Sequence, residues 1–133
     1  MQFFYELTIK TKGQGLYNLT NKTTELIKKQ KINIGILNLY ILHTSASLTI
    51  QENADPDVLY DIRNFFNKLV PMNNNFYRHN TEGIDDMPAH LKTMLTNTQL
   101  TLSVKNKKLI LGTWQGIYLF EHRLKSQNRT ISY

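Results

Sequence analysis

The sequence contains no cysteine, one tryptophan, three prolines and six glycines among its 133 residues. The lack of cysteine excludes disulfide bonds, thiolate zinc ligands, iron–sulfur clusters and cysteine nucleophiles. Any metal ion must therefore be held by histidine or by oxygen ligands. The most apolar stretch, residues 34–42, is interrupted by Asn38 and is far shorter than the roughly 20 residues of a membrane-spanning helix.

The N-terminal residues also lack a basic segment followed by a long apolar one, so they do not have the pattern of a secretion signal. We therefore expect a cytoplasmic protein with no membrane partner. The length predicts a single domain over residues 1–133. A domain of this size buries about two thirds of the surface of its unfolded chain, so it needs no covalent cross-links.

The charge is unevenly distributed along the chain, although its total is +6. Residues 1–31 carry six lysines and two glutamates, and residues 105–133 carry six basic groups and one acidic group. Residues 32–104 carry four basic and seven acidic groups. This acidic middle interrupts any continuous basic surface, and no known nucleic-acid-binding motif is present, so we expect no nucleic-acid ligand.

The first half of the chain predicts four strands and one helix. Residues 3–10 are rich in aromatic and β-branched residues and predict a strand, with residues 16–20 as a short partner. Residues 21–31 predict a surface helix with basic residues at its C-terminal end. Residues 35–43 are apolar on both faces, as in a central strand, and residues 48–51 predict another strand.

The clearest helix begins at Asp55 and Pro56, where an N-cap acceptor precedes proline at the first helical position. Apolar residues then recur at spacings of three and four up to Pro71, which predicts a wide buried stripe. Residues 73–86 have little periodicity and predict a long loop. Loops of this length are most often functional.

A shorter helix is expected after Asp85 or Asp86. We expect its inward-facing residues to be Leu91, Met94 and Leu95. Residues 100–111 predict a hairpin, and residues 117–122 and 130–133 predict two further strands. The order of elements predicts an α+β fold, with a largely antiparallel sheet or β-sandwich and helices on one side.

Four histidines and several carboxylates are candidates for a site, because histidine binds metals and transfers protons near neutral pH. The histidines are His43, His79, His90 and His122. Taken singly, each of these histidines is more often a surface or structural residue than part of a site. Among the carboxylates, Asp55 is first of all a helix cap, Glu52 has no such structural explanation, and Asp85 and Asp86 fit a capping role and a site role equally well.

Hydroxyl-bearing and small residues at strand ends are candidates for binding an anion such as phosphate. They comprise Thr44, Ser45 and Ser47, and Thr113 and Gln115 within Gly112–Gly116. For the second group, a turn with Trp114 packed on the core is the favoured interpretation. Arg78 next to His79 could pair with phosphate in a bidentate manner, although a surface arginine is the default.

Three blocks of sequence taken together resemble the YjbQ-type family, described as secondary thiamine-phosphate synthases. The blocks are HTSASLTIQENADPDVLYDI, YRHNTEGIDDMPAHLK and LGTWQGIYLFEHR, which run from His43 to Arg123. This chain departs from the family pattern at Gln51, where Asn is common, and at Phe120, where Trp is frequent. The resemblance implies a YjbQ-like α+β fold, a homotrimer, and a pocket near subunit boundaries that contains the motif histidines.

The resemblance also implies a low thiamine-phosphate synthase activity, a transferase reaction on small phosphorylated heterocyclic substrates. As a mechanism we hypothesise a divalent metal ion held by His43, His79 and His90, with Glu52, Asp55 and His122 as catalytic residues. Imidazole ligands favour zinc, with magnesium as the alternative.

Two other functions stay open at this point. The same pocket could belong to a metal-dependent hydrolase of a small phosphorylated metabolite, because a histidine-rich site also suits attack by a metal-bound hydroxide. The chain could also be a non-catalytic trimeric protein that binds a nucleotide-like ligand or RNA, and this function predicts binding that weakens steeply with salt.

Overall fold

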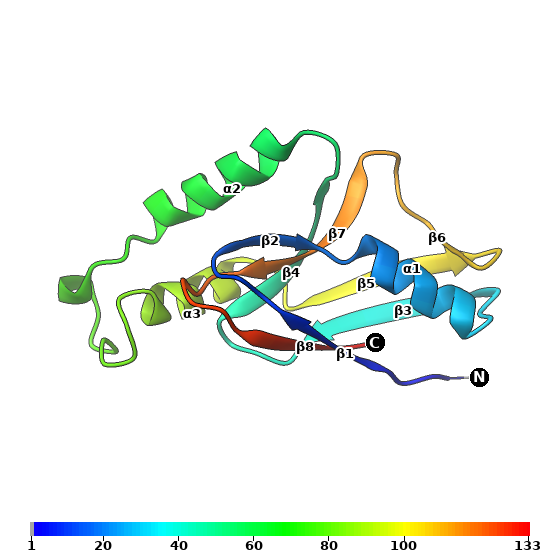
Figure 1. The fold of residues 1–133 in the computed structure, drawn as a ribbon, viewed down its shortest axis with the longest axis horizontal. Helices are drawn as coiled ribbons and strands as arrows, with labels where there is room; N and C mark the ends of the chain where they lie inside the picture. The colour runs from blue at the N-terminus through cyan, green and yellow to red at the C-terminus, as the bar shows by residue number, and fades with distance from the viewer. Residues whose placement is uncertain (1) are drawn as a thin grey trace.

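The computed structural model describes residues 2–133, which form two antiparallel sheets, three α-helices and one short 3-10 helix (Figure 1). The larger sheet contains, in order, β1 (Glu6–Lys10), β8 (Asn128–Ser132), β3 (Ile34–Ile41), β5 (Gln99–Lys105) and β6 (Lys108–Leu109). The smaller sheet contains β2 (Gly15–Asn18), β7 (Gln115–Glu121) and β4 (Ala46–Glu52). The helical elements are α1 (Thr20–Lys29), α2 (Pro56–Leu69), the 3-10 helix η1 (Asn74–Phe76) and α3 (Asp86–Leu95).

The core lies between the two sheets. Strands of the larger sheet supply buried residues such as Leu39 and Ile131, and strands of the smaller sheet supply Leu48 and Leu119. Ile27 of α1 completes this cluster from one side. The prediction of an α+β fold with antiparallel strands is confirmed, and the predicted strands and helices are present with shifts of a few residues at their ends.

The hairpin between β5 and β6 follows from local chemistry. Asn106 and Lys107 both have positive φ, 53° and 60°, as a two-residue turn with the twist of an antiparallel pair requires. Asparagine tolerates this backbone region better than most residues. No helix within residues 2–133 combines the length and the apolar composition needed to cross a membrane.

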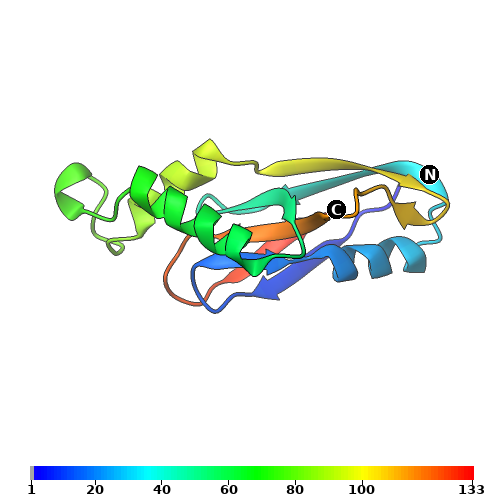
Figure 2. The same ribbon diagram turned by 90° about the horizontal axis from the view of Figure 1, so that it is seen from above.

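Helix α2 begins as predicted but is less buried than predicted. The carboxylate of Asp55 accepts a hydrogen bond from the Asp57 amide at 2.9 Å, and Pro56 is the first helical residue. Figure 1 shows α2 lying apart from the strands along much of its length, and Figure 2 shows it extending past one end of the sheets. Phe66 packs edge-on against Phe120 of β7, with ring centres 5.6 Å apart, yet no residue of α2 is fully buried in this chain.

The inward face of α3 differs from the prediction. Met94 and Leu95 are 83% and 58% exposed, whereas the buried residues of the helix are Asp86, Pro88, Ala89, Lys92 and Thr93. The prediction of an inward Met94 and Leu95 was therefore wrong. Asp86 and Lys92 have partners on other elements, Arg123 and Asn67, and these contacts favour an orientation of the helix in which both side chains are inside.

The segment Gly112–Gly116 also departs from expectation at its tryptophan. Trp114 is 64% exposed and is not packed on the core. Its backbone carbonyl accepts from the Asn53 amide at 3.0 Å, and the Gln115 side chain accepts from the Gly112 amide at 2.7 Å. These polar contacts hold the turn, so the indole ring is not needed for that purpose.

Candidate metal centre

Two histidines and one aspartate converge where the loop after α2 meets the start of α3. His79 comes from the loop, Asp86 is the first residue of α3, and His90 follows one helical turn later. Residues four apart share one face of a helix, so Asp86 and His90 point the same way. One ligand atom from each of the three residues lies within 4.8 Å of the other two.

The distances within this group are short. His79 Nε2 lies 2.6 Å from Asp86 Oδ2, and His90 Nε2 lies 3.3 Å from the same oxygen. The two imidazole ring centres are 5.6 Å apart. The Asp86 carboxylate is nearly inaccessible to solvent, whereas both rings are partly exposed, so the group opens to solvent on the histidine side.

The tautomer of His90 is determined by a backbone carbonyl. His90 Nδ1 donates to the Thr44 oxygen at 2.9 Å, and a carbonyl can only accept, so Nδ1 carries the hydrogen. In the neutral ring Nε2 then directs a lone pair toward Asp86, which is also an acceptor. A metal ion, or a proton on Nε2, is required to remove the repulsion between these two atoms. Metal-binding histidines are commonly oriented by such a bond from the other ring nitrogen.

Arg123 holds both carboxylates at the start of α3. Its Nε donates to Asp85 Oδ2 at 2.9 Å, its Nη1 donates to Asp86 Oδ1 at 2.5 Å, and its Nη2 donates to the Glu82 carbonyl at 2.9 Å. The second oxygen of Asp86 is therefore the one that faces His79 and His90. Each of the three guanidinium nitrogens makes one of these contacts, so the Arg123 side chain is fixed against the loop before α3 and the first residue of that helix.

The pKa values of Asp85 and Asp86 are both lowered. Burial raises the pKa of Asp86, but the hydrogen bond from His79 and the positive charges of Arg123 and His90 outweigh it. Burial also raises the pKa of Asp85, and bonds from the Leu124 amide and from Arg123 reverse the effect. Both groups are therefore carboxylates at neutral pH, as a metal ligand must be.

His43 has a different environment from the other two predicted metal ligands. Its Nε2 accepts from the Thr130 amide at 2.7 Å, which ties the ring to β8. Burial lowers the pKa of His43, and the charge of Arg129 lowers it further while Glu121 raises it. The group within the described residues that could hold a metal ion includes His79 and His90 of the predicted set and has Asp86 in place of His43.

The predicted catalytic His122 is completely buried. Its Nε2 lies 2.9 Å from Ser47 Oγ, and its Nδ1 has no hydrogen-bond partner within residues 2–133. Burial, together with the charges of Lys92 and Arg129, lowers the pKa of His122 to about 3. The ring is neutral at physiological pH, and it lies outside the group formed by His79, Asp86 and His90.

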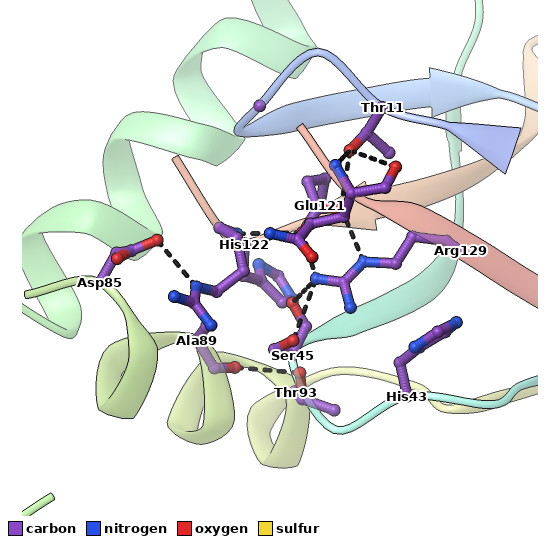
Figure 3. Close-up of polar contacts among 12 residues, drawn as sticks. Thr11, His43, Ser45, Asp85, Ala89, Thr93, Glu121, His122 and Arg129 are labelled. Atoms are coloured by element: carbon purple, nitrogen blue, oxygen red, sulfur yellow. Dashed lines mark hydrogen bonds and ion pairs between the residues drawn. The ribbon is translucent and has the colours of Figure 1, made fainter. Parts of the chain in front are cut away.

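Ser45 accepts a hydrogen bond from Arg129, which forms a buried ion pair with Glu121 (Figure 3). Arg129 donates to the two oxygens of Glu121 at 2.7 Å and 2.6 Å, and to Ser45 Oγ at 3.0 Å. Thr11 donates to Glu121 at 2.9 Å. Both carboxylate oxygens of Glu121 thus have structural partners, so the cluster stabilises the junction of the two sheets.

Four of the remaining predicted site residues lie at the other end of β4, whereas Thr44 and Arg78 lie near the histidine group. Glu52 ends that strand, about 20 Å along it from Ala46. Its side chain accepts from the Asp55 amide at 3.3 Å, while Asp55 caps α2. Thr113 and Gln115 lie at the same end, since Gln115 pairs with Glu52. Thr44 orients His90, and Arg78 is next to His79 in the loop.

Two residues of chemical interest were not among the predicted metal ligands and catalytic residues. One is Asp86, which fitted a capping role and a site role equally well, although its spacing of four from His90 on a helix is typical of metal ligands. The other is Lys92, which is 1% exposed and donates to Asn67 Oδ1 at 2.6 Å. Burial lowers the pKa of Lys92 to about 8. No local pattern marks a lysine on a short helix as buried.

Solved structures confirm the fold. A conserved protein of the YjbQ/UPF0047 family from Clostridium acetobutylicum superposes with a TM-score of 0.88 at 33% identity, covering 97% of this chain and 98% of that one. A conserved hypothetical protein from Thermus thermophilus gives a TM-score of 0.85 at 32% identity, with the same coverage. The former is described as uncharacterised.

Curated relatives have the same family name. The UPF0047 protein sll1880 of Synechocystis is 46% identical over 125 residues, covering 94% of this chain and 85% of the relative. The UPF0047 protein YjbQ of Escherichia coli O157:H7 is 44% identical over 126 residues, covering 94% and 91%. These names indicate no thiamine-phosphate synthase activity. The prediction of that activity from the shared motifs is therefore wrong.

The three predicted motif blocks thus mark a family and a fold. The model of the family "UPF0047 protein YjbQ-like" matches residues 5–133, which is nearly the whole sequence. The match contains His79, Asp86 and His90 together with the strands and helices that position them. The chain therefore belongs to the UPF0047 YjbQ-like family.

Proposed function

We propose that this protein is a metal-dependent enzyme whose divalent ion, zinc in the first place, is bound by His79, Asp86 and His90. The observation that carries the proposal is the convergence of two ring nitrogens and one carboxylate oxygen within 4.8 Å. The tautomer of His90 supports it, because the Thr44 carbonyl leaves Nε2 free to bind a cation.

The chemistry of the donor set favours zinc. Two imidazoles and one carboxylate suit a borderline ion, whereas magnesium prefers oxygen ligands and retains several waters. Three protein ligands leave one tetrahedral position open, as in catalytic zinc sites. A bound zinc ion would act there as a Lewis acid on a water or a substrate oxygen.

The chain's own residues orient the ligands. Arg123 occupies one oxygen of Asp86 and leaves the other for the metal, so we expect monodentate coordination by this carboxylate. The Thr44 carbonyl fixes the His90 ring. His79 and His90 are partly exposed, which gives water and substrate access to the open position.

Metal analysis tests this proposal. We expect the purified protein to bind about one equivalent of zinc, and the variants His79→Ala and His90→Ala to bind it at least about tenfold more weakly. His43→Ala is the matched control, because this histidine lies outside the group, and its metal content should equal that of the wild type. Equal metal content in all four proteins would refute the site.

Cobalt substitution tests whether a coordination position is open. Cobalt(II) in place of zinc gives visible absorption bands that depend on coordination number. Added azide should shift these bands if a fourth position is free. Bands that stay unchanged at saturating azide would indicate a closed structural site and would contradict a catalytic role.

We also propose a homotrimer, as the family resemblance implies. The exposed apolar residues of α2 support self-association, since Tyr60, Phe65 and Leu69 are each more than half exposed. Sedimentation equilibrium of the wild type and of Phe65→Asp tests this. We expect a trimer that weakens in the variant, and a wild type that is monomeric at all concentrations would refute it.

A further inference from the structure

Two segments that are far apart in the sequence bring six lysines to one end of the molecule. They are Lys28, Lys29 and Lys31 at the C-terminal end of α1, and Lys105, Lys107 and Lys108 in the β5–β6 hairpin. The Lys107 amide donates to the Asn33 carbonyl at 3.2 Å, and Lys105 pairs with Ile34 at the start of β3. We call this surface the lysine end, and Figure 1 shows α1 and β6 close together there.

The lysine end accounts for the net charge of the chain. Its six positive charges equal the total of +6, because the other ten basic groups balance the ten acidic groups of the sequence. No acidic residue occurs within residues 26–36 or 98–112. The seven acidic groups of the middle segment lie between Glu52 and Asp86, from the end of β4 to the start of α3. They therefore do not divide this surface, although they separate its two segments in the sequence.

The six lysine side chains are exposed and have no counter-charges. Within residues 2–133 none of them forms an ion pair, whereas Arg123 and Arg129 both pair with carboxylates. Uncompensated like charges repel one another and raise the free energy of the folded chain. Binding of a polyanion would remove this repulsion, so the lysine end is suited to a ligand with many closely spaced negative charges.

The residue types at the lysine end favour a nucleic-acid backbone over a membrane. Lysine binds phosphate as a compact point charge. Residues 28–34 and 105–110 contain no aromatic residue, so they lack the Trp and Tyr anchors that are typical of membrane interfaces. Ile34 and Ile110 are exposed beside the lysines, but two side chains are much less than the apolar face of a membrane-binding helix.

The shape of the lysine end favours a duplex over a single strand. The end of α1 and a hairpin turn form it, and in Figure 2 they lie at one end of an elongated molecule. Proteins that bind single strands use a positively charged groove with aromatic side chains on which the bases stack. The lysine end has no aromatic residue, and a projecting end contacts a duplex from outside without enclosing a strand.

Amide side chains between the lysines favour RNA over DNA. Gln30 and Asn33 lie next to the lysines of the first segment, and Asn106 lies in the hairpin turn. An amide side chain both donates and accepts hydrogen bonds, as does the 2′-hydroxyl group that RNA carries and DNA lacks. Double-stranded RNA presents these hydroxyl groups, together with its phosphates, along a wide and shallow minor groove that a projecting surface can contact.

We propose that the lysine end is a docking surface for double-stranded RNA, which it binds through phosphates and 2′-hydroxyl groups without regard to base sequence. The lysines contact phosphates on both sides of the minor groove, and the amide side chains contact the hydroxyl groups between them. The candidate metal centre lies at the start of α3, toward the other end of the molecule in Figure 1. This binding therefore does not depend on the proposed metal function.

A fluorescent RNA duplex of about 16 base pairs tests the proposal by anisotropy with the full chain. We expect saturable binding with a dissociation constant of the order of 1–10 µM at low salt. The affinity should fall by up to about a thousandfold between about 50 and 200 mM salt, because six lysines release counterions from six phosphates. A second duplex of unrelated sequence should bind equally well.

Two triple variants with the same loss of charge give the matched comparison. Replacing Lys105, Lys107 and Lys108 by Gln should weaken binding at least about tenfold and lower the slope of log affinity against log salt by about 3. Replacing Lys10, Lys12 and Lys125 by Gln is the control, since these lysines are exposed but lie outside the lysine end. Urea unfolding checks that both variants are folded. Equal binding by the two variants would overturn the proposal.

Other polyanions serve as competitors in the same assay. We expect a DNA duplex of the same sequence to bind at least about threefold more weakly than the RNA duplex, because it lacks the 2′-hydroxyl groups. Equal binding of the two duplexes would overturn the choice of RNA. Tighter binding to polyglutamate, or to phosphatidylcholine vesicles that contain phosphatidylserine, would assign the lysine end to an acidic protein or to a membrane and would also overturn the proposal.

Discussion

His122 is the histidine with the most strongly lowered pKa, and this has a consequence for stability. Its pKa is about 3 in the folded protein and 6.5 as a free side chain. Below pH 6.5 His122 becomes protonated in the unfolded chain but stays neutral in the folded protein, so stability falls as the pH drops toward 3. We expect a loss of about 2 kcal/mol between about pH 7 and pH 5, measured by urea unfolding.

The control for this prediction is His122→Gln, which can still bond to Ser47 but does not titrate. We expect this variant to be less stable at neutral pH and to lose much less stability on mild acidification. An equal loss in the two proteins would assign the acid sensitivity to other groups.

The Glu121–Arg129 pair gives a second prediction at this scale. Both side chains are almost completely buried. Glu121→Gln leaves the Arg129 charge without its counter-charge, which we expect to cost about 3–5 kcal/mol. The double variant Glu121→Leu with Arg129→Leu should be more stable than the single variant, because no unpaired charge is left. Chemical unfolding of the three proteins checks the order.

Single residues also show how far the site could be predicted. His79 and His90 were candidates because histidines at element ends often belong to sites. For Asp86 the sequence fitted a helix-capping role and a site role equally well, and only the fold shows that its carboxylate bonds to His79 and Arg123. His43 has the same sequence signals, but Thr130, 87 residues later, occupies its ring nitrogen.

Among the helices and strands, α2 is the element whose stability depends most on its N-terminal cap. Because none of its residues is fully buried in this chain, the helix depends on its cap more than a core helix does. We expect Asp55→Ala to cost about 1 kcal/mol and to speed hydrogen exchange in the first turns of α2. Asp61→Ala is the control on the exposed face, and an equal effect there would argue against the cap.

The loop between α2 and α3 is the element that a metal should affect. His79 lies in this loop, whereas Asp86 and His90 belong to α3, so a bound ion would tie the loop to the helix. We expect added zinc to slow limited proteolysis within residues 71–85 at least about threefold, by suppressing local opening. The variant His79→Ala should be cleaved equally fast with and without zinc, and a zinc effect that persists there would place the ion elsewhere.

The two helices after β4 show the limit of periodicity. The pattern of α2 correctly placed its start and end, but it could not show that the chain alone leaves much of the stripe exposed. In α3 the apolar residues Met94 and Leu95 suggested the inward face, while the actual inward face carries Asp86 and Lys92. Tertiary ion pairs and hydrogen bonds decided that orientation, and they connect residues far apart in the chain.

For the whole molecule, strand order explains both what was predictable and what was not. Alternation and turn residues indicated the strands and the β5–β6 hairpin, which are local features. The pairing of β1 with β8, and the division into two sheets, depend on contacts across most of the chain. The sequence motifs identified the family, yet the function that the resemblance suggested did not follow from it.

Two buried basic groups of the molecule act together on its pH range. The pKa of His122 is lowered to about 3 and that of Lys92 to about 8, each mainly by burial. For both groups the unfolded chain binds more protons than the folded one. For His122 this difference applies between about pH 3 and pH 6.5, and for Lys92 it applies between about pH 8 and pH 10.5. Raising the pH through either range therefore favours folding, so this protein should tolerate mild alkali better than mild acid.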